Sequence, residues 1–314
     1  MITPGQATEA TRLGGAGGPV EGAPAPPAGR GFWRESWRRL RANRLGMAAA
    51  AVILAMAALA LLAPLLSAGL THRGFSEQDI ANNFAPPGTA GHWLGTDELG
   101  RDTLTRLIWG AQVSLSVGFL TVAISILLGT AVGLLAGYHG GLLDDLLMRL
   151  VDAILSVPRL FLFILVGILF FRRTSVLSLS VVIASVGWGG TARLVRGEVL
   201  SIKNRDFMLA TRSIGAGAGR LIVRHLLPNA LPVLIVAASL GVGGVILAEA
   251  ALDYLGFGIH PPTPSWGNML SNAQQYFFHS VWLVFLPGAS IFLTVLAANL
   301  FGNAVRDAFD PRLR

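Results

Sequence analysis

The stretch AQVSLSVGFLTVAISILLGTAVGLLAGY, residues Ala111–Tyr138, contains no charged residue and decides the fold class. A helix needs about 20 apolar residues to cross the hydrocarbon core of a bilayer, and this run exceeds that length. Its apolar residues are continuous and do not alternate with polar ones, which favours a membrane-spanning helix over a strand of a membrane β-barrel. The composition agrees, because 53% of the 314 residues are hydrophobic and only 13% are charged, about half the usual charged share of a soluble domain.

Five further runs have the length and hydropathy of a membrane span. Together with the first, the predicted spans are Met47–Leu66, Ala111–Tyr138, Val151–Phe171, Val176–Thr191, Leu231–Leu252 and Val281–Asn303. The glycines near the end of the fourth run leave its boundary open. The sequence therefore predicts an all-α polytopic membrane protein with six transmembrane helices.

The distribution of charge predicts how the chain lies in the membrane. The net charge of +7 comes almost wholly from arginine, because Lys203 is the only lysine. If the N-terminus lies inside, most of the 24 Lys and Arg residues fall in segments on that same side. Lys and Arg are enriched in cytoplasmic segments of membrane proteins, so we expect both termini in the cytoplasm. Arg172 and Arg173, in a short outer segment, run against this bias.

Composition divides the chain into four parts. Residues 1–29 are rich in Gly, Ala and Pro, which predicts a disordered tail. Residues 30–85 join a basic, tryptophan-containing segment to the first span. That basic segment is either an amphipathic helix on the inner membrane face or a charged flank that only sets orientation. Residues 108–306 carry the other spans, and residues 307–314 form a cytoplasmic tail.

The inner segment 193–229 carries the strongest functional signal. Asn204 is expected to cap a short helix that has Asp206 in its first turn, and Gly215 is placed to end that helix in the left-handed conformation. The apolar face of the helix consists of Phe207, Ala210, Thr211 and Ile214, and the opposite face of Arg205, Arg212 and Ser213. Such a helix is too short to be stable alone. It therefore packs either against its own bundle or against a cytoplasmic partner.

This segment resembles the EAA loop of ABC importer permeases, in which Glu-Ala-Ala is followed by three residues, a Gly and a later Leu-Pro. The corresponding sequence is DFMLATRSIG at 206–215 and HLLPN at 225–229. Leu209 stands in place of the Glu, and Thr211 in place of the second Ala. The residues that match the pattern are Ala210, Gly215, Leu227 and Pro228.

Further motifs narrow the resemblance to the C-type permease subunit of dipeptide and oligopeptide importers. They are HWLGTDELGRD at 92–102, GAQVSL at 110–115, DLLMRLVD at 145–152 with Pro158, LAEAALDYLGFG at 247–258 and GNAVRDAFDPRLR at 302–314. These motifs agree in order and spacing with the family. The resemblance covers residues 32–314.

The resemblance implies the type I transmembrane domain fold of ABC importers and a permease subunit of the bacterial inner membrane. Such a subunit forms half of a peptide pathway and contacts membrane lipid. Its implied partners are a homologous B-type permease subunit, two ATPase subunits and an extracytoplasmic substrate-binding protein. Glutathione and nickel chelates are the alternative substrates of the same family pattern. The two outer segments, Ser67–Gly110 and Gly256–Ser280, are the candidate surfaces for the binding protein.

In this family the EAA loop forms a coupling helix that sits in a groove of the ATPase. Closure of the ATPase pair on ATP draws the coupling helices together and opens the pathway outward, and hydrolysis resets it. The residues carried over to this role are Ala210, Thr211, Gly215 and Pro228, with Arg205, Phe207 and Arg212 as neighbouring docking residues.

Charged residues in or near the spans are candidates for the pathway, because charge is costly inside a membrane. Glu249 and Asp253 are four residues apart and share one helix face. They either attract a peptide ammonium group or form an interior polar pair, for example with Arg159 or with a partner subunit. Arg159 is itself a pathway candidate, with a structural role as its alternative. Arg149 and Asp152 predict a local ion pair.

Several classes of function are excluded or disfavoured. The chain has no cysteine, which excludes disulfides, zinc–thiolate sites and a cysteine nucleophile. Its only lysine, Lys203, is not part of a phosphate-binding loop, and its histidines lack metal-ligand spacing. We therefore expect no catalytic residues, metal, cofactor or nucleic-acid partner. The resemblance implies that partner subunits hydrolyse ATP. An ion-driven secondary transporter is the less favoured alternative, because no inverted repeat is evident.

Overall fold

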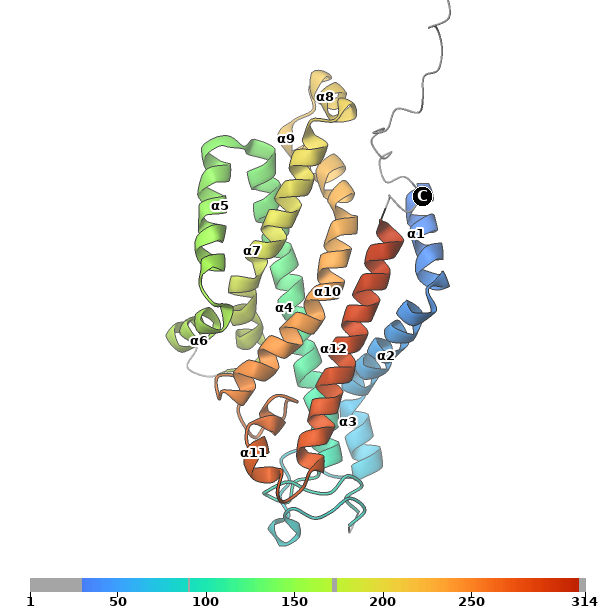
Figure 1. Cartoon of the computed structure of the whole chain (residues 1–314), viewed down its shortest axis with the longest axis vertical. Helices are drawn as coiled ribbons and strands as arrows, with labels where there is room; N and C mark the ends of the chain where they lie inside the picture. The colour runs from blue at the N-terminus through green and yellow to red at the C-terminus, as the bar shows by residue number, and fades with distance from the viewer. Residues whose placement is uncertain (1–29, 90, 171–173, 311–314) are drawn as a thin grey trace, which may run out of the picture.

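A computed structural model describes residues 30–89, 91–170 and 174–310, so the tail 1–29 and the pair Arg172–Arg173 lie outside the described residues. The protein is an elongated bundle of helices (Figure 1). Its α-helices are α1 (Arg30–Ala42), α2 (Arg44–Leu61), α3 (Ala63–Leu66), α4 (Thr103–His139), α5 (Gly141–Ser156), α6 (Arg159–Phe170), α7 (Val176–Lys203), α8 (Asp206–Ser213), α9 (Ala218–Leu221), α10 (Leu227–Tyr254), α11 (Ala273–Tyr276) and α12 (Trp282–Phe309).

The predicted multi-pass fold is confirmed. In the described part of the chain, five helical segments are long and apolar enough to cross a membrane, and a bent pair of helices brings the number to six. The five segments that meet this criterion singly are α2, α4, α7, the continuous stretch Ala218–Tyr254 that contains α10, and α12. At about 1.5 Å per residue, the 37 residues of α4 extend well beyond the thickness of a bilayer core.

The third predicted span, Val151–Phe171, is wrong as a single straight helix. α5 ends at Ser156 and α6 starts at Arg159, and the two helices are bent by 99°. Pro158 explains the break, because proline lacks a backbone N–H and pushes the residue before it out of the helical region. Val157 is indeed extended, with φ −94° and ψ 139°. The turn places Arg159 at the first position of α6.

α4 and α7 pack closely along their length. A Cβ atom added to Gly129, Gly133 or Gly137 of α4 would lie 2.5–2.8 Å from side-chain atoms of α7. Glycines four residues apart lie on one helix face and let two backbones approach. This packing carries α7 past the predicted end of the fourth span at Thr191, as far as Lys203. The Lys203 Nζ donates a hydrogen bond of 2.9 Å to the Gly137 carbonyl, so both helices end at one level.

Ion pairs hold α5 against α7. The local pair that the sequence predicts within α5 does not form. Asp152 pairs with Arg193 of α7 and not with Arg149. About two turns earlier on α5, Asp144 accepts hydrogen bonds from Arg196 of α7. Asp144 and Asp152 of α5 thus form their ion pairs with arginines of the neighbouring helix α7.

The basic segment near the N-terminus forms α1, the helix that one of the two predictions proposed. α1 does not continue straight into α2, because Asn43 intervenes and caps α2 by accepting the Gly46 N–H at 2.9 Å. Leu40 of α1 is buried against α12, and the Trp33 ring lies 5.4 Å from that of Phe309. As a result α1, the end of α12 and α8 all lie at one end of the molecule (Figure 1).

Candidate functional site

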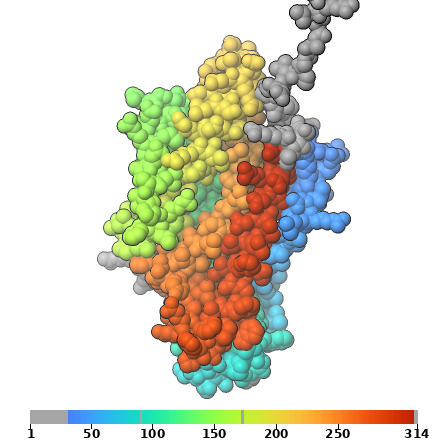
Figure 2. Space-filling model, viewed as in Figure 1, coloured from blue at the N-terminus to red at the C-terminus, as the bar shows by residue number. Residues whose placement is uncertain are grey.

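The coupling-loop candidate is a small helix seated on the ends of α4 and α7. Met208 of α8 is 2% exposed and belongs to an apolar cluster with Leu134 of α4 and Val199 of α7. The Arg212 guanidinium carbon lies 5.8 Å from the centre of the Tyr138 ring at the end of α4. One side of α8 is therefore fixed by its own bundle, while the segment itself projects beyond the neighbouring helices at the top of Figure 2.

The predicted C-cap at Gly215 is confirmed. Gly215 has φ +82°, and its N–H donates to the Arg212 carbonyl at 3.0 Å. The Ala216 N–H donates to the Thr211 carbonyl at 3.3 Å, which completes a Schellman motif. No atom lies within 4 Å of a Cβ built at Gly215. The glycine is therefore required by backbone conformation and not by lack of space.

The N-terminal cap and the apolar face of α8 differ from the prediction. Asn204 ends α7, and the residue before α8 is Arg205, whose carbonyl accepts the N–H groups of Met208 and Leu209 at 2.9 and 3.1 Å. The predicted face is only half right, because Phe207 and Thr211 are half-buried whereas Ala210 is exposed and Ile214 is 84% exposed. The difference arises because the buried side of the helix is centred on Met208, which packs against α4 and α7.

The exposed side of α8 is consequently mixed in character. It presents Leu209, Ala210, Arg212, Ser213 and Ile214. Phe207 lies below it with its ring 6.4 Å from that of His225. Pro228 is exposed at the start of α10, directly after a π-helical turn at Ile222–Leu226. Proline removes a backbone donor and crowds the preceding turn, which accounts for the widened turn there.

A cavity of about 650 Å³ opens in the middle of the bundle, between α4, α6, α7 and α10. Arg159 lines it and is exposed in this chain. Sequence reasoning named Arg159 but missed the small polar side chains around it, which are Thr121, Ser125 and Thr191. The signal for these residues in the sequence is a hydroxyl-bearing side chain within a predicted apolar span. Neither Glu249 nor Asp253 is among the lining residues.

Glu249 and Asp253 lie instead in a buried polar cluster that fixes the outer loop after α10. Glu249 is 0% exposed and accepts a hydrogen bond from the Ser114 hydroxyl of α4 at 3.0 Å. Asp253 accepts the Ile259 N–H at 2.5 Å and also the Ser265 hydroxyl. The Trp266 N–H donates to Ser114 at 3.2 Å. The described structure thus pairs both carboxyl groups with serine hydroxyls and backbone, and not with Arg159.

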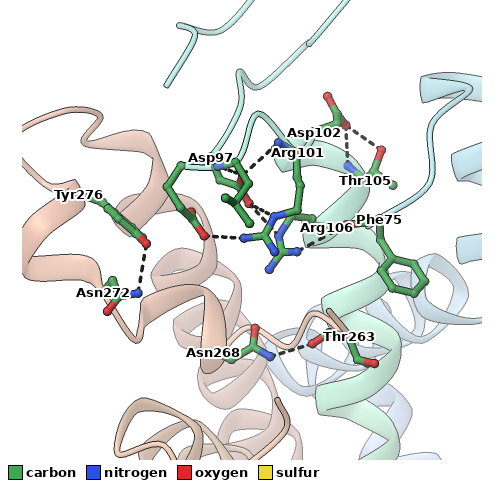
Figure 3. Close-up of polar contacts among 12 residues, drawn as sticks. Phe75, Asp97, Arg101, Asp102, Thr105, Arg106, Thr263, Asn268, Asn272 and Tyr276 are labelled. Carbon is green, nitrogen blue, oxygen red and sulfur yellow. Dashed lines mark hydrogen bonds and ion pairs between the residues drawn. The ribbon is translucent and has the colours of Figure 1, made fainter. Parts of the chain in front are cut away.

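The two outer segments expected to face the binding protein pack against each other. Asp97 accepts from Arg101 Nε at 2.7 Å and pairs with Arg106 at 3.2 Å, and all three side chains are buried (Figure 3). These groups line one small pocket of about 70 Å³ together with Asn268 and Tyr276 of the second segment. Most outer charges are therefore satisfied internally.

Two residues complete the outer cluster. Asp102 caps α4 by accepting the Thr105 N–H at 2.8 Å, and its other oxygen lies 2.9 Å from Nδ1 of the buried His92. Tyr276 accepts a hydrogen bond from Asn272 at 3.1 Å (Figure 3). Burial, and after it the negative charge of Glu98, raises the pKa of Tyr276. The phenol therefore stays neutral, and the pocket keeps a hydroxyl group at its rim.

Comparison with known proteins agrees with this architecture. Residues 129–314 match the family described as binding-protein-dependent transport system inner membrane component. Residues 31–87 match the N-terminal transmembrane domain of oligopeptide transport permease C. One chain of the MetNI methionine ABC transporter in inward-facing conformations superposes with a TM-score of 0.53 at 19% identity, covering 65% of this chain and 96% of its own. That likeness shows the fold.

Relatives of similar length share much higher identity. The dipeptide transport system permease protein DppC of Alkalihalophilus pseudofirmus is 40% identical over 282 residues, which is 90% of each chain. The oligopeptide transport system permease protein OppC of Bacillus subtilis is 34% identical, again over 90% of each chain. The glutathione transport system permease protein GsiD of Pectobacterium atrosepticum is 36% identical over 90% of this chain and 92% of its own. The chain therefore belongs to the family of inner membrane components of binding-protein-dependent transport systems, the permease subunits of ABC importers.

Proposed function

We propose that this chain is the C-type permease subunit of a peptide importer and forms half of its translocation pathway. The observation that carries the proposal is the cavity of about 650 Å³ in the bundle, on a chain whose similar relatives are named dipeptide and oligopeptide permeases. A homologous B-type subunit closes the open side of the cavity. Substrate then passes between the two subunits.

The proposed orientation places α8 and both ends of the chain in the cytoplasm. The basic residues of α1 and of the α7–α10 connection lie at this end, in keeping with the excess of Lys and Arg on cytoplasmic segments. The outer loops, with the buried cluster of Asp97, Arg101 and Arg106, then face the compartment of the substrate-binding protein. Both outer segments contribute to one surface there.

α8 is the proposed coupling helix that seats in one ATPase subunit. Its buried Met208 and its link from Arg212 to Tyr138 attach it to α4 and α7. Movement of α8 is therefore passed to α4 and α7, two of the four helices that line the cavity. The proposed contact residues are Ala210, Thr211 and Arg212, supported by Arg205, Phe207, Gly215 and Pro228.

The test is reconstitution of the complete complex in proteoliposomes, with this chain, the B-type subunit, both ATPase subunits and the binding protein. Uptake of radiolabelled trialanine is measured with ATP, without ATP, and with an imposed proton or sodium gradient. The proposal expects uptake that requires ATP and the binding protein. Uptake driven by the ion gradient alone would overturn it. Parallel assays with glutathione and a nickel chelate decide between the substrates of the family.

A further inference from the structure

Arg159 is the single ionisable residue that lines the cavity in the described part of the chain. The break at Pro158 places it there, because α6 turns by 99° away from α5 and begins with this residue. The remaining lining consists of apolar side chains, glycines and the hydroxyl-bearing Thr121, Ser125 and Thr191. The cavity therefore carries one positive charge, and the rest of its lining is uncharged.

The charge of Arg159 has no counter-ion among the described residues. No hydrogen bond or ion pair of the structure includes its guanidinium, whereas Arg193 and Arg196 of α7 are paired with acids of α5. The two acids of α10, Glu249 and Asp253, accept hydrogen bonds from serine hydroxyls and form no ion pair with Arg159 in the described structure. A charge within membrane spans is costly unless it is paired or solvated. An anion that enters the cavity would therefore be favoured at Arg159.

The chemistry of that anion follows from the guanidinium and from the lining. Arginine offers a planar set of donors that matches a carboxylate in a bidentate arrangement. Every linear peptide with an unmodified C-terminus carries a carboxylate there, whatever its side chains. A single arginine in an otherwise uncharged cavity suits recognition of that shared group. Such a cavity does not discriminate between the side chains of the peptide.

We propose that Arg159 is a specificity-determining residue that pairs with the terminal carboxylate of the peptide during passage through the cavity. The inference rests on the proposed peptide import. It adds a second selection step, inside the membrane and separate from the binding protein. Peptides whose terminus is neutral are then expected to be released from the binding protein yet to cross more slowly.

The experiment uses the complete complex in proteoliposomes and two probes, trialanine and trialanine amide. Uptake of each is measured for the wild type, Arg159→Gln and Arg159→Lys, and expressed as the ratio of variant to wild type. The ratio removes any preference of the binding protein, which is the same in every sample. Arg149→Gln is the matched control, because Arg149 is an exposed arginine on the adjacent helix α5 that does not line the cavity.

Loss of a charge-assisted contact corresponds to about tenfold in affinity. We expect Arg159→Gln to lower trialanine uptake by about tenfold and to leave amide uptake within about twofold of the wild type. Arg159→Lys restores most of the trialanine uptake, and Arg149→Gln changes neither probe. Equal loss of both probes would overturn the proposal and would indicate a pair between Arg159 and an acid of the B-type subunit. No loss of trialanine uptake would also overturn it.

The wild-type measurements distinguish failure of the proposed peptide import from failure of the proposal for Arg159. If the wild-type complex imports neither probe with ATP, peptide import itself is wrong, whatever the variants do. If wild-type uptake of the amide is too slow to measure, the order of trialanine uptake decides. The proposal then requires wild type, Arg159→Lys, Arg159→Gln and Arg159→Glu to fall in that order, with the ATPase subunits retained in each purified complex. Any other order contradicts it.

Discussion

Arg196 of α7 and Asp144 of α5 form a bidentate ion pair, with Nε 2.5 Å from Oδ1 and Nη2 2.7 Å from Oδ2. α5 lies at the edge of the bundle and exposes several leucines, so apolar burial against this chain holds it weakly. The pair with Asp144, together with that between Arg193 and Asp152, attaches α5 to α7 at two levels. This attachment positions the break before α6 and hence Arg159.

Removal of the ion pair is expected to loosen α5. Arg196→Gln and Asp144→Asn should each lower the melting temperature of the detergent-solubilised protein, and a double-mutant cycle should give a coupling free energy of about 1 kcal/mol. The pair is partly exposed, with the Arg196 side chain 34% accessible, which keeps the value low. Arg149→Gln is the control and should leave the melting temperature unchanged. Additive effects of the two substitutions would show that the pair contributes nothing.

The glycine contacts between α4 and α7 predict a larger effect. A Cβ at Gly133 would lie 2.6 Å from the Ala192 carbonyl oxygen and 2.7 Å from the Val195 Cβ, so Gly133→Val must push the helices apart. We expect a loss of about 1–3 kcal/mol, read as a lower melting temperature and a lower yield of monodisperse protein. Gly190→Val on α7 is the matched control, because nothing lies within 4 Å of its added Cβ. Equal stability of the two variants would contradict the packing.

Gly215 offers a test of the coupling helix that does not depend on space. Gly215→Ala forces an L-residue into φ +82°, which costs about 1 kcal/mol, and should fray the C-terminal end of α8. We expect weaker co-purification of the ATPase subunits and lower ATP-dependent uptake. Gly217→Ala is the control in the same loop, because Gly217 has φ −70° and open space around it. Normal assembly and uptake of Gly215→Ala would count against the coupling role.

The buried cluster around Asp253 predicts a structural effect at the outer loop. Asp253→Ala leaves the Ile259 N–H and the Ser265 hydroxyl without their acceptor, and an orphaned buried donor costs about 1–3 kcal/mol. We expect faster limited proteolysis within residues 256–280 and unchanged proteolysis at α8. Ser271→Ala is the control, because Ser271 is exposed in the same loop. Protection equal to wild type would show that the carboxylate does not hold the loop.

Glu249→Gln tests the hypothesis, drawn from the sequence, that Glu249 lies in the translocation pathway. Glutamine keeps the shape and can still bond to the Ser114 hydroxyl, which lies 3.0 Å from Glu249. A position in the pathway predicts lower trialanine uptake by an intact complex, whereas a role in the buried cluster predicts uptake close to wild type. Measurement of uptake and of assembly in the same preparation separates the two.

Much of the fold follows from the sequence, because long apolar runs leave little choice but to span a bilayer. Gly215 was equally readable, since few residues other than glycine adopt φ +82° at a helix end. The buried side of α8 could not be predicted in full, because Met208 is buried by α4 and α7, and helical periodicity does not contain that contact. The glycines 129, 133 and 137 carry a readable spacing, but their partner α7 is specified only in three dimensions.

The charged residues show the same division. Glu249 and Asp253 share a face, as their spacing requires, but their partners Ser114 and Ser265 lie on another helix and in the loop after α10. Asp152 has an arginine three residues away and still pairs with Arg193 of the neighbouring helix α7. Local spacing predicts which side chains are neighbours on one helix, and the packing of helices decides which of them bind.

The pair α5 and α6 also decides whether the number of candidate membrane crossings is odd or even. Without α5 and α6 the apolar helices number five, and an odd number would put the two ends on opposite sides. The Trp33 and Phe309 rings lie 5.4 Å apart, so the two ends of the described chain lie together. Counted as one crossing, the bent pair brings the candidate spans to six, and an even number agrees with two ends that lie together.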